Sequence, residues 1–366
     1  MTENLYKDLR EQLDQYSVGF PATESGVEIQ ILRKLFSEDE AEMYLNLSMM
    51  LEAPQDVAGR VGKDPKEVET LLERMFERGQ IFRVKKGDVS KYGAAPFVVG
   101  SYEHQVKNMD RQFAELFERY FIEAFGQAGL SQSAPLRTVP VNKAVEHLWQ
   151  VKPYEDLRQI IKTKDKISVS KCVCRVQQGL LEKGCGKPLE ACIQLGSHAQ
   201  YYVDKGMGRF ITREEALNIL DKCDEAGLVP QPFISQDTGG ICNCCGDCCG
   251  ILRSIKLHPK PVEKVLTNYH AQIDSSACSA CGTCLDRCQM EAIGIDGEPG
   301  AQINRDRCIG CGLCVTTCPS DAISLHVKPE SERKDPPGTG RDYMVQLAAT
   351  RGKTLIPLAV IKKAQG

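Results

Sequence analysis

The chain contains CSACGTCLDRC at residues 278–288 and CIGCGLCVTTC at residues 308–318. Each run spaces its four cysteines by two, two and three intervening residues, and the second run repeats the first thirty residues later. Three further pairs match at the same offset: Gly282 with Gly312, Ala292 with Ala322, and Ile293 with Ile323. Three thiolates at this spacing wrap one face of an iron–sulfur cubane, so we interpret the runs as an internal repeat that holds two clusters.

The repeat resembles the bacterial-type 2[4Fe–4S] ferredoxin domain over about residues 267–328. In that family the fourth cysteine of each run binds the cluster of the other run. The resemblance therefore implies two ligand sets: Cys278, Cys281, Cys284 and Cys318 for one [4Fe–4S] cluster, and Cys308, Cys311, Cys314 and Cys288 for the other. Zinc knuckles are the alternative, but zinc sites pair their CxxC units over longer separations. The first copy has Gln289 where the second has Pro319, a departure that removes no ligand.

The whole chain has 366 residues, a formal net charge of −3 and 18 cysteines. Its length suggests two or three domains, and its charge gives no general attraction to nucleic acid or acidic membranes. We find no apolar signal segment and no apolar run long enough to span a membrane. Cysteines without an export signal favour metal ligation in a reducing cytoplasm over disulfides. Low-potential clusters are oxygen-labile, which suggests an anaerobic source.

The N-terminal part predicts a winged-helix-like domain over about residues 27–100. Ser37 and Glu40 form a capping box, and Asp64 is a clear N-cap for a further helix. IFRVKKGDVSKY then reads as a β-hairpin with a tight turn at residues 86–88. A longer helix is expected at residues 102–125. Its aromatic stripe favours a core or a homodimer interface, and we expect His104 to be structural.

The helix that would enter the major groove is acidic, which bears on nucleic-acid binding. Residues 64–78 carry five acidic side chains against three basic ones, while the wing is basic. Phosphate contacts dominate DNA affinity, so an acidic helix opposes it. We therefore expect the domain to dock a protein or a second copy of the chain, and we do not expect it to bind nucleic acid.

A second cysteine-rich region lies between residues 171 and 250 and includes KCVCR and ICNCCGDCCG. Its candidate metal ligands are Cys172, Cys174, Cys185, Cys192, Cys242, Cys244, Cys245, Cys248 and Cys249. Cys223 shares an apolar helix face and is expected in the core. A third [4Fe–4S] cluster, or a third and a fourth, fits this number of thiols, and one structural zinc with spare thiols is the alternative. The first four cysteines can form one site and the last five another, or the two groups can mix.

Most of the chain resembles a family of cytoplasmic 4Fe–4S ferredoxin-type proteins of anaerobes. The resemblance rests on KCVCR, PLEAC, GMGRFITREEAL and ICNCCGDCC, and on GFPATESGVEIQILRKLF near the N-terminus. It implies an α+β multidomain chain with these parts: an N-terminal helix and link (1–26), a winged-helix-like domain with a long amphipathic helix (27–130), a cysteine-rich domain (131–264), a 2[4Fe–4S] ferredoxin domain (265–328) and a tail (329–366).

No nucleotide-binding glycine motif and no persuasive catalytic triad occur in the sequence. We therefore predict an electron-transfer iron–sulfur protein or subunit, rather than a stand-alone enzyme, that passes single low-potential electrons between redox partner proteins. Two alternatives remain open. One is an oxidoreductase whose catalytic iron–sulfur centre lies within residues 172–249, and the other is a redox-sensing winged-helix regulator that binds DNA.

Overall fold

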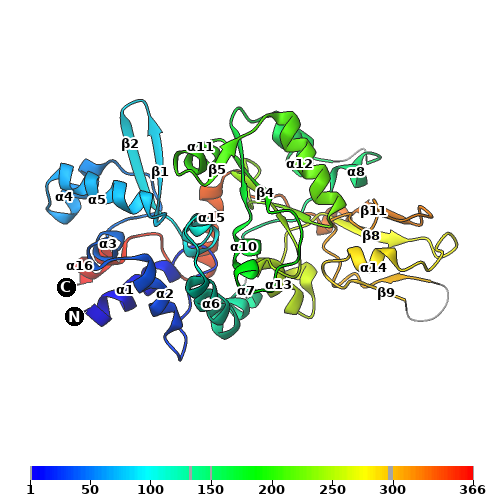
Figure 1. The fold of residues 1–366 in the computed structure, drawn as a ribbon, viewed down its shortest axis with the longest axis horizontal. Coiled ribbons are helices and arrows are strands. Elements are labelled where there is room, and N and C mark those ends of the chain that lie inside the picture. Colours follow the sequence, from blue (N-terminus) through cyan, green and yellow to red (C-terminus); the bar gives the residue numbers. More distant parts are fainter. Residues whose placement is uncertain (1, 132–133, 149–150, 296–299, 366) are drawn as a thin grey trace. The chain divides into compact units, whose positions relative to one another are not determined.

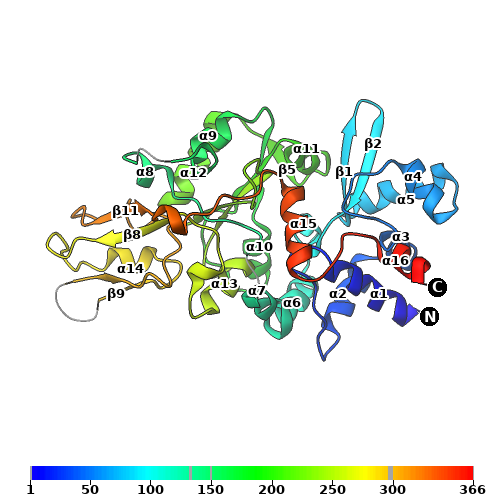
Figure 2. The same cartoon turned by 180° about the vertical axis from the view of Figure 1, so that it is seen from behind.

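The computed structural model describes residues 2–131, 134–148, 151–295 and 300–365. The chain forms two compact units of mixed helix and strand. Unit 1 comprises residues 1–128, 180–182 and 344–366, and unit 2 comprises residues 129–179 and 183–343. The elements of both units are labelled in Figure 1 and seen from behind in Figure 2. None of the described helices is long and apolar enough to cross a membrane.

Unit 1 begins with five helices and a β-hairpin: α1 (Thr2–Asp14), α2 (Val27–Leu35), α3 (Glu38–Tyr44), α4 (Pro54–Val61), α5 (Pro65–Glu77), β1 (Ile81–Lys86) and β2 (Val89–Ala94). The expected N-cap is confirmed, because the Asp64 carboxylate accepts a hydrogen bond from Lys66 N at 2.9 Å. The hairpin is also confirmed, with Lys86 paired to Val89 across a two-residue turn. Gly87 in that turn has a φ of 58°, which favours glycine.

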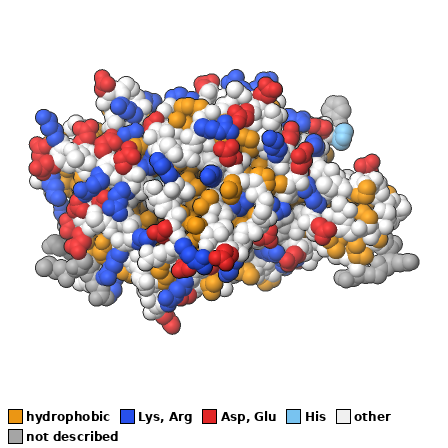
Figure 3. Space-filling view, in the orientation of Figure 1, with side chains coloured by type: hydrophobic (Ala, Val, Ile, Leu, Met, Phe, Trp, Pro, Cys, Tyr) orange, Lys and Arg blue, Asp and Glu red, His pale blue; other side chains and the backbone are white. Residues whose placement is uncertain are grey.

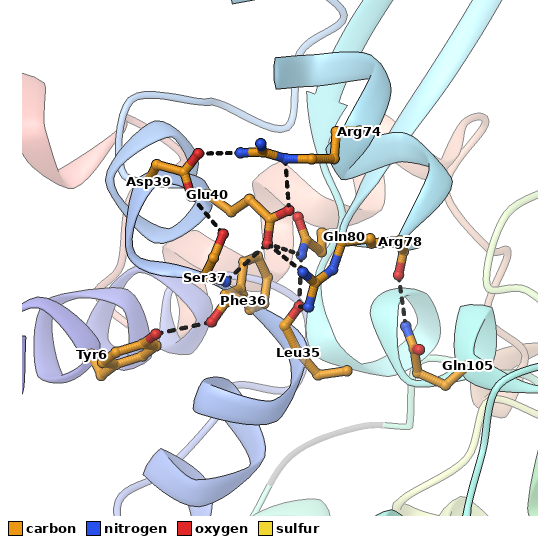
Figure 4. A network of polar contacts seen from close by, with 10 residues as sticks. All are labelled: Tyr6, Leu35, Phe36, Ser37, Asp39, Glu40, Arg74, Arg78, Gln80 and Gln105. Atoms are coloured by element: carbon orange, nitrogen blue, oxygen red, sulfur yellow. Dashed lines mark hydrogen bonds and ion pairs between the residues drawn. The ribbon is translucent and has the colours of Figure 1, made fainter. Parts of the chain in front are cut away.

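Glu40 is the centre of a polar network that joins α3 to α5 (Figure 4). Its side chain is fully buried and accepts hydrogen bonds from Ser37 N at 2.9 Å and Gln80 Nε2 at 2.7 Å. It also forms ion pairs with Arg74 at 3.2 Å and Arg78 at 3.4 Å. The network therefore engages two of the three basic side chains of the 64–78 helix inside unit 1.

The prediction of a single helix at residues 102–125 is wrong about where that helix begins. Helix α6 (Arg111–Tyr120) starts after Asp110, whose extended backbone and side-chain bond to Phe113 N at 2.7 Å end any helix running in from upstream. The residues before it form short turns, η1 (Phe97–Ser101) and η2 (Glu103–Gln105). After it, the chain continues through a π-helical turn, η3 (Phe121–Phe125), into α7 (Gly126–Ser131).

The aromatic stripe of this segment belongs to the core of unit 1. Phe113, Phe117 and Tyr120 are buried, and the rings of Tyr102 and Phe117 stack with centroids 3.9 Å apart. His104 is buried, with its Nδ1 3.0 Å from Gly79 O, as expected of a structural histidine.

The C-terminal helices are α15 (Gly340–Thr350) and α16 (Leu358–Gln365). In α16, Leu358 N donates a hydrogen bond to Gln12 Oε1 of α1 at 2.5 Å. Both ends of the chain therefore lie on unit 1, close to each other in both views (Figure 1, Figure 2).

Unit 2 is built on a five-stranded antiparallel sheet. Its strand order is β5 (Gly208–Phe210), β3 (Ile167–Lys171), β4 (Glu190–Leu195), β7 (Gly240–Cys244) and β6 (Val229–Pro232). Its helices are α8 (Asn142–Val145), α9 (Leu157–Lys162), α10 (Val173–Leu180), α11 (Ser197–Asp204), α12 (Arg213–Glu225) and α13 (Gly250–Leu257), with 3₁₀ turns η4 (Pro153–Glu155), η5 (Pro261–Glu263) and η6 (Glu330–Glu332). Cys223 of α12 is buried in the core beside this sheet, as predicted.

The repeated cysteine runs lie in a small two-layered part of unit 2. Strand β8 (Tyr269–Ile273) pairs with β11 (Ile323–Val327), and β9 (Ile293–Gly294) pairs with β10 (Gln302–Ile303); both pairs are antiparallel. Helix α14 (Thr283–Arg287) is the α-helix among the described residues of this part. A buried segment, residues 134–141, connects this part to the five-stranded sheet: Arg137 N donates to Pro232 O at 3.0 Å and Val141 N to Cys311 O at 3.0 Å.

Candidate metal centres

The eight cysteines of the repeat line two separate cavities. Cavity I is lined by Cys278, Cys281, Cys284 and Cys318. Cavity II is lined by Cys288, Cys308, Cys311 and Cys314. Each run thus contributes its fourth cysteine to the cavity of the other run. These are the two sets of thiols that the resemblance implied, while ligation itself stays a prediction.

The backbone of both runs repeats as closely as their cysteines do. Three pairs of residues, all offset by thirty, have a positive φ: Ala280 and Gly310, Gly282 and Gly312, Glu291 and Asp321. Glycine is needed at 310, because a Cβ there would lie 2.3 Å from Tyr269 O. Sequence reasoning found the match at Gly282 but missed the other two pairs, which the same offset could have revealed.

Backbone N–H groups point at the thiols of cavity II. Ala271 N donates to Cys308 Sγ at 3.5 Å, and Ala292 N donates to Cys288 Sγ at 3.2 Å. Such bonds favour the thiolate form, and they raise the reduction potential of a cluster held by these sulfurs. The donor set therefore fits an anionic iron–sulfur cluster.

The two cavities differ in exposure. Cys281 of cavity I is exposed, and a hydrogen bond from the Thr283 hydroxyl lowers its pKa. In cavity II, burial raises the pKa of Cys311 to about 12. Helix α14 leads from Cys284 in cavity I to Cys288 in cavity II, four residues that rise only about 6 Å. A cluster in cavity I would thus face solvent, and one in cavity II would lie a single helical turn behind it.

Apart from Cys223, the nine cysteines from residue 172 to residue 249 separate into two groups. In six of them each thiol shifts the pKa of its two neighbours around a closed ring, here called the six-thiol ring, in the order Cys172, Cys174, Cys249, Cys244, Cys242, Cys192 and back to Cys172. The other three, here called the three-thiol site, are Cys185, Cys245 and Cys248, whose sulfurs all lie within 4.8 Å of one another. The structure therefore mixes the early and late cysteines, which was one of the two groupings left open.

Strand geometry explains the division. Side chains alternate between the two faces of a strand, so Cys242 and Cys244 of β7 share one face. Ile193 pairs with Ile241, which sets Cys192 of β4 beside Cys242. Each pair of adjacent cysteines is divided between the two groups. Cys244 and Cys249 belong to the six-thiol ring, and their neighbours Cys245 and Cys248 belong to the three-thiol site.

Arg175 is a buried cation beside the six-thiol ring. Its side chain donates to Asn243 O at 3.1 Å, while its Nε and one terminal nitrogen have no hydrogen-bond partner among the described residues. Burial opposes its charge, but the neighbouring thiolates, Cys172 foremost, outweigh burial and raise its pKa. A buried guanidinium with unused N–H groups fits an anionic group held by the ring. By contrast, Lys171 on the other side of KCVCR is exposed.

The loop that carries the three-thiol site packs directly against the ferredoxin repeat. Gly246 N donates a hydrogen bond to Gln289 Oε1 at 2.8 Å. A Cβ on Gly246 would lie only 2.6 Å from Gln289 O. Because Gln289 follows Cys288 of cavity II, this contact gives a physical reason for the glutamine that replaces the proline of the second copy.

Comparison with known proteins identifies the repeat. Residues 271–325 match the family model of a 4Fe–4S dicluster domain. No curated protein sequence matches the chain. The matched range contains all eight cysteines of cavities I and II, so the chain is an iron–sulfur protein that carries [4Fe–4S] clusters in its ferredoxin-like part.

Proposed function

We propose that the chain is an electron-transfer protein or subunit that passes single low-potential electrons between redox partner proteins. The observation that carries this proposal is the unbroken series of thiol sites within unit 2. Cavity I leads through α14 to cavity II, and Gln289 joins cavity II to the loop at residues 245–248. When bound, the clusters supply one-electron redox chemistry. The protein's part is to hold them close together and to exclude water from the inner ones.

The difference in exposure gives the series a direction. A partner reaches cavity I most easily, because Cys281 is exposed there. Cavity II has an apolar wall that includes Met290, Ile309 and Leu313. We therefore propose that external partners exchange electrons at cavity I and that cavity II relays them inward.

We also propose that the six-thiol ring holds a further iron–sulfur cluster, the inner member of the series. A cubane with full cysteine ligation uses four thiolates, so the ring has two to spare. Arg175 supports the assignment, because its buried charge and unused N–H groups suit an anionic cluster.

Metal analysis after purification without oxygen tests this proposal. We expect about twelve iron atoms per chain, four for each of three cubanes. Cys281→Ala and Cys311→Ala should each remove the electron paramagnetic resonance signature of one ferredoxin cluster and leave the other. About eight iron atoms would remove the third cluster from the proposal, and survival of both signatures in either variant would contradict the ligand sets.

We propose that residues 27–130 are a winged-helix-like module that docks a partner protein or a second copy of the chain. We also propose that the protein is cytoplasmic. Arg74 of α5 and Arg78, which caps its C-terminal end, are engaged by Glu40. Arg83 of the wing pairs with Glu73 at 2.8 Å and stacks over Phe76. These contacts engage three arginines within the module and leave the exposed lysines of the wing, Lys85, Lys86 and Lys91, as the cations that a phosphate backbone could meet there. Figure 3 shows acidic and basic side chains intermixed on the visible face of this unit.

A further inference from the structure

We propose that Cys185, Cys245 and Cys248 bind one tetrahedral metal ion, Zn²⁺, separate from the iron–sulfur clusters. Its fourth coordination position is left to an exogenous ligand, a water molecule or a small thiol. This inference goes beyond the proposed electron transfer and does not depend on it.

The spacing of the sulfurs distinguishes a single ion from a cubane. The Sγ atoms of Cys185 and Cys245 lie 3.7 Å apart, and all three sulfurs lie within 4.8 Å. Two thiolates on one tetrahedral zinc ion, each about 2.3 Å from it, lie about 3.8 Å apart. In a cubane each thiolate binds a different iron, so its sulfurs are more widely separated. In the part of the chain that the structure describes, no three sulfurs of cavity I or of cavity II all lie within 4.8 Å of one another.

The protein surroundings of the site favour a preformed metal centre. Cys245 and Cys248 are 0% and 1% exposed and belong to the core of unit 2, so they are held in place from inside. Cys185 is only partly buried and comes from a loop whose neighbours, Gly184 and Gly186, are exposed. This loop closes the site from the solvent side.

The ligand count leaves the site open. Within the part of the chain that the structure describes, no fourth histidine, cysteine, aspartate or glutamate joins the group at this distance. Structural zinc sites have four protein ligands, whereas sites that bind an exchangeable ligand have three. Thiolates are soft ligands that select zinc over magnesium or calcium. The geometry thus fits zinc with one exchangeable position.

The position of the site connects it to the ferredoxin repeat. The same loop that supplies Cys245 and Cys248 is bonded through Gly246 to Gln289. A metal ion at the three-thiol site would therefore hold this loop rigid beside Cys288.

Zinc and iron contents of the full chain, purified without oxygen and washed with a chelator, test the proposal. We expect one zinc per chain. Cys185→Ser and Cys248→Ser should each lose that zinc while the iron content stays unchanged. Cys223→Ala, which alters a buried cysteine outside both groups, should keep both metals. Cys185 lies on an exposed loop, so its variant remains informative if Cys248→Ser fails to fold.

X-ray absorption at the zinc edge gives an independent readout. We expect three sulfur neighbours at about 2.3 Å and one lighter atom, replaced by a fourth sulfur when 2-mercaptoethanol is added. Absence of zinc, or loss of about four iron atoms in Cys185→Ser, would overturn the proposal. Four sulfurs without added thiol would show that another cysteine closes the site. Absence of zinc from a wild-type chain that still holds its iron and its cluster signatures would overturn the zinc site alone and leave the proposed electron transfer standing.

Discussion

Gly246→Ala perturbs the contact between the three-thiol loop and the ferredoxin repeat without touching a cysteine. The added Cβ would lie 2.6 Å from Gln289 O, whereas ordinary contact begins at 3.4 Å. The loop and Gln289 must therefore separate by about 0.8 Å, and the hydrogen bond from Gly246 N to Gln289 Oε1 is lost or lengthened.

Overpacking in a well-packed region lowers the free energy of unfolding by about 1–3 kcal/mol. For a unit of about 200 residues, each kcal/mol lowers the melting temperature by about 2–4 °C, so we expect a fall of about 2–12 °C. The displacement of Gln289 also reaches Cys288, the residue that directly precedes it in the chain. The signature of a cluster in cavity II should therefore broaden or shift, while that of a cluster in cavity I stays unchanged.

The assay is thermal unfolding of the loaded protein, together with electron paramagnetic resonance of the reduced form. Gly179→Ala is the matched control, because a Cβ at that position meets nothing within 4 Å. Equal melting temperatures and identical spectra for Gly246→Ala and Gly179→Ala would refute the idea that this contact couples the two regions.

Three further predictions concern side chains outside the cysteines. Arg175→Gln removes the buried cation beside the six-thiol ring and should lower the reduction potential of a cluster there by on the order of 50–100 mV. Arg175→Lys keeps the positive charge, so the potential should stay close to that of the wild type. A redox titration that finds no change in Arg175→Gln would contradict an interaction between Arg175 and the cluster. Glu40→Ala should destabilise unit 1 by about 1–3 kcal/mol, because Gln80 and Ser37 N lose their buried acceptor, while exposed Glu42→Ala serves as the near-neutral control in denaturant unfolding. The full chain should not shift duplex DNA even at low salt, and a salt-sensitive shift abolished by Lys85→Ala and Lys86→Ala would instead support the regulator.

Local signals in the sequence predicted local structure well. The N-cap at Asp64 and the hairpin after Gly79 rest on side chains within a few residues of each other, so the pattern alone was sufficient. The resemblance to two-cluster ferredoxins likewise predicted which cysteines share a cavity, because in that family the fourth cysteine of each run belongs to the other cluster. The helix expected from residue 102 failed because Asp110 offers a better start than the apolar stripe indicated.

The division of the nine candidate ligands from residue 172 to residue 249 could not be predicted, because it depends on strand pairing distant in sequence. Cys192 meets Cys242 only because β4 and β7 are neighbours in the sheet. Cys185 reaches Cys245 across sixty residues of chain, and nothing near Cys185 indicates that partner. The role of Gln289 was equally hidden, since its contact at Gly246 is forty-three residues away.

The split vicinal pairs have a consequence for how the protein matures. Cys244 and Cys245, like Cys248 and Cys249, are joined by one peptide bond yet serve different sites. Loading either site therefore fixes the backbone from which the other takes its ligands. Metal binding at one site should therefore speed binding at the other, and a chain starved of iron should acquire its zinc more slowly than a replete one.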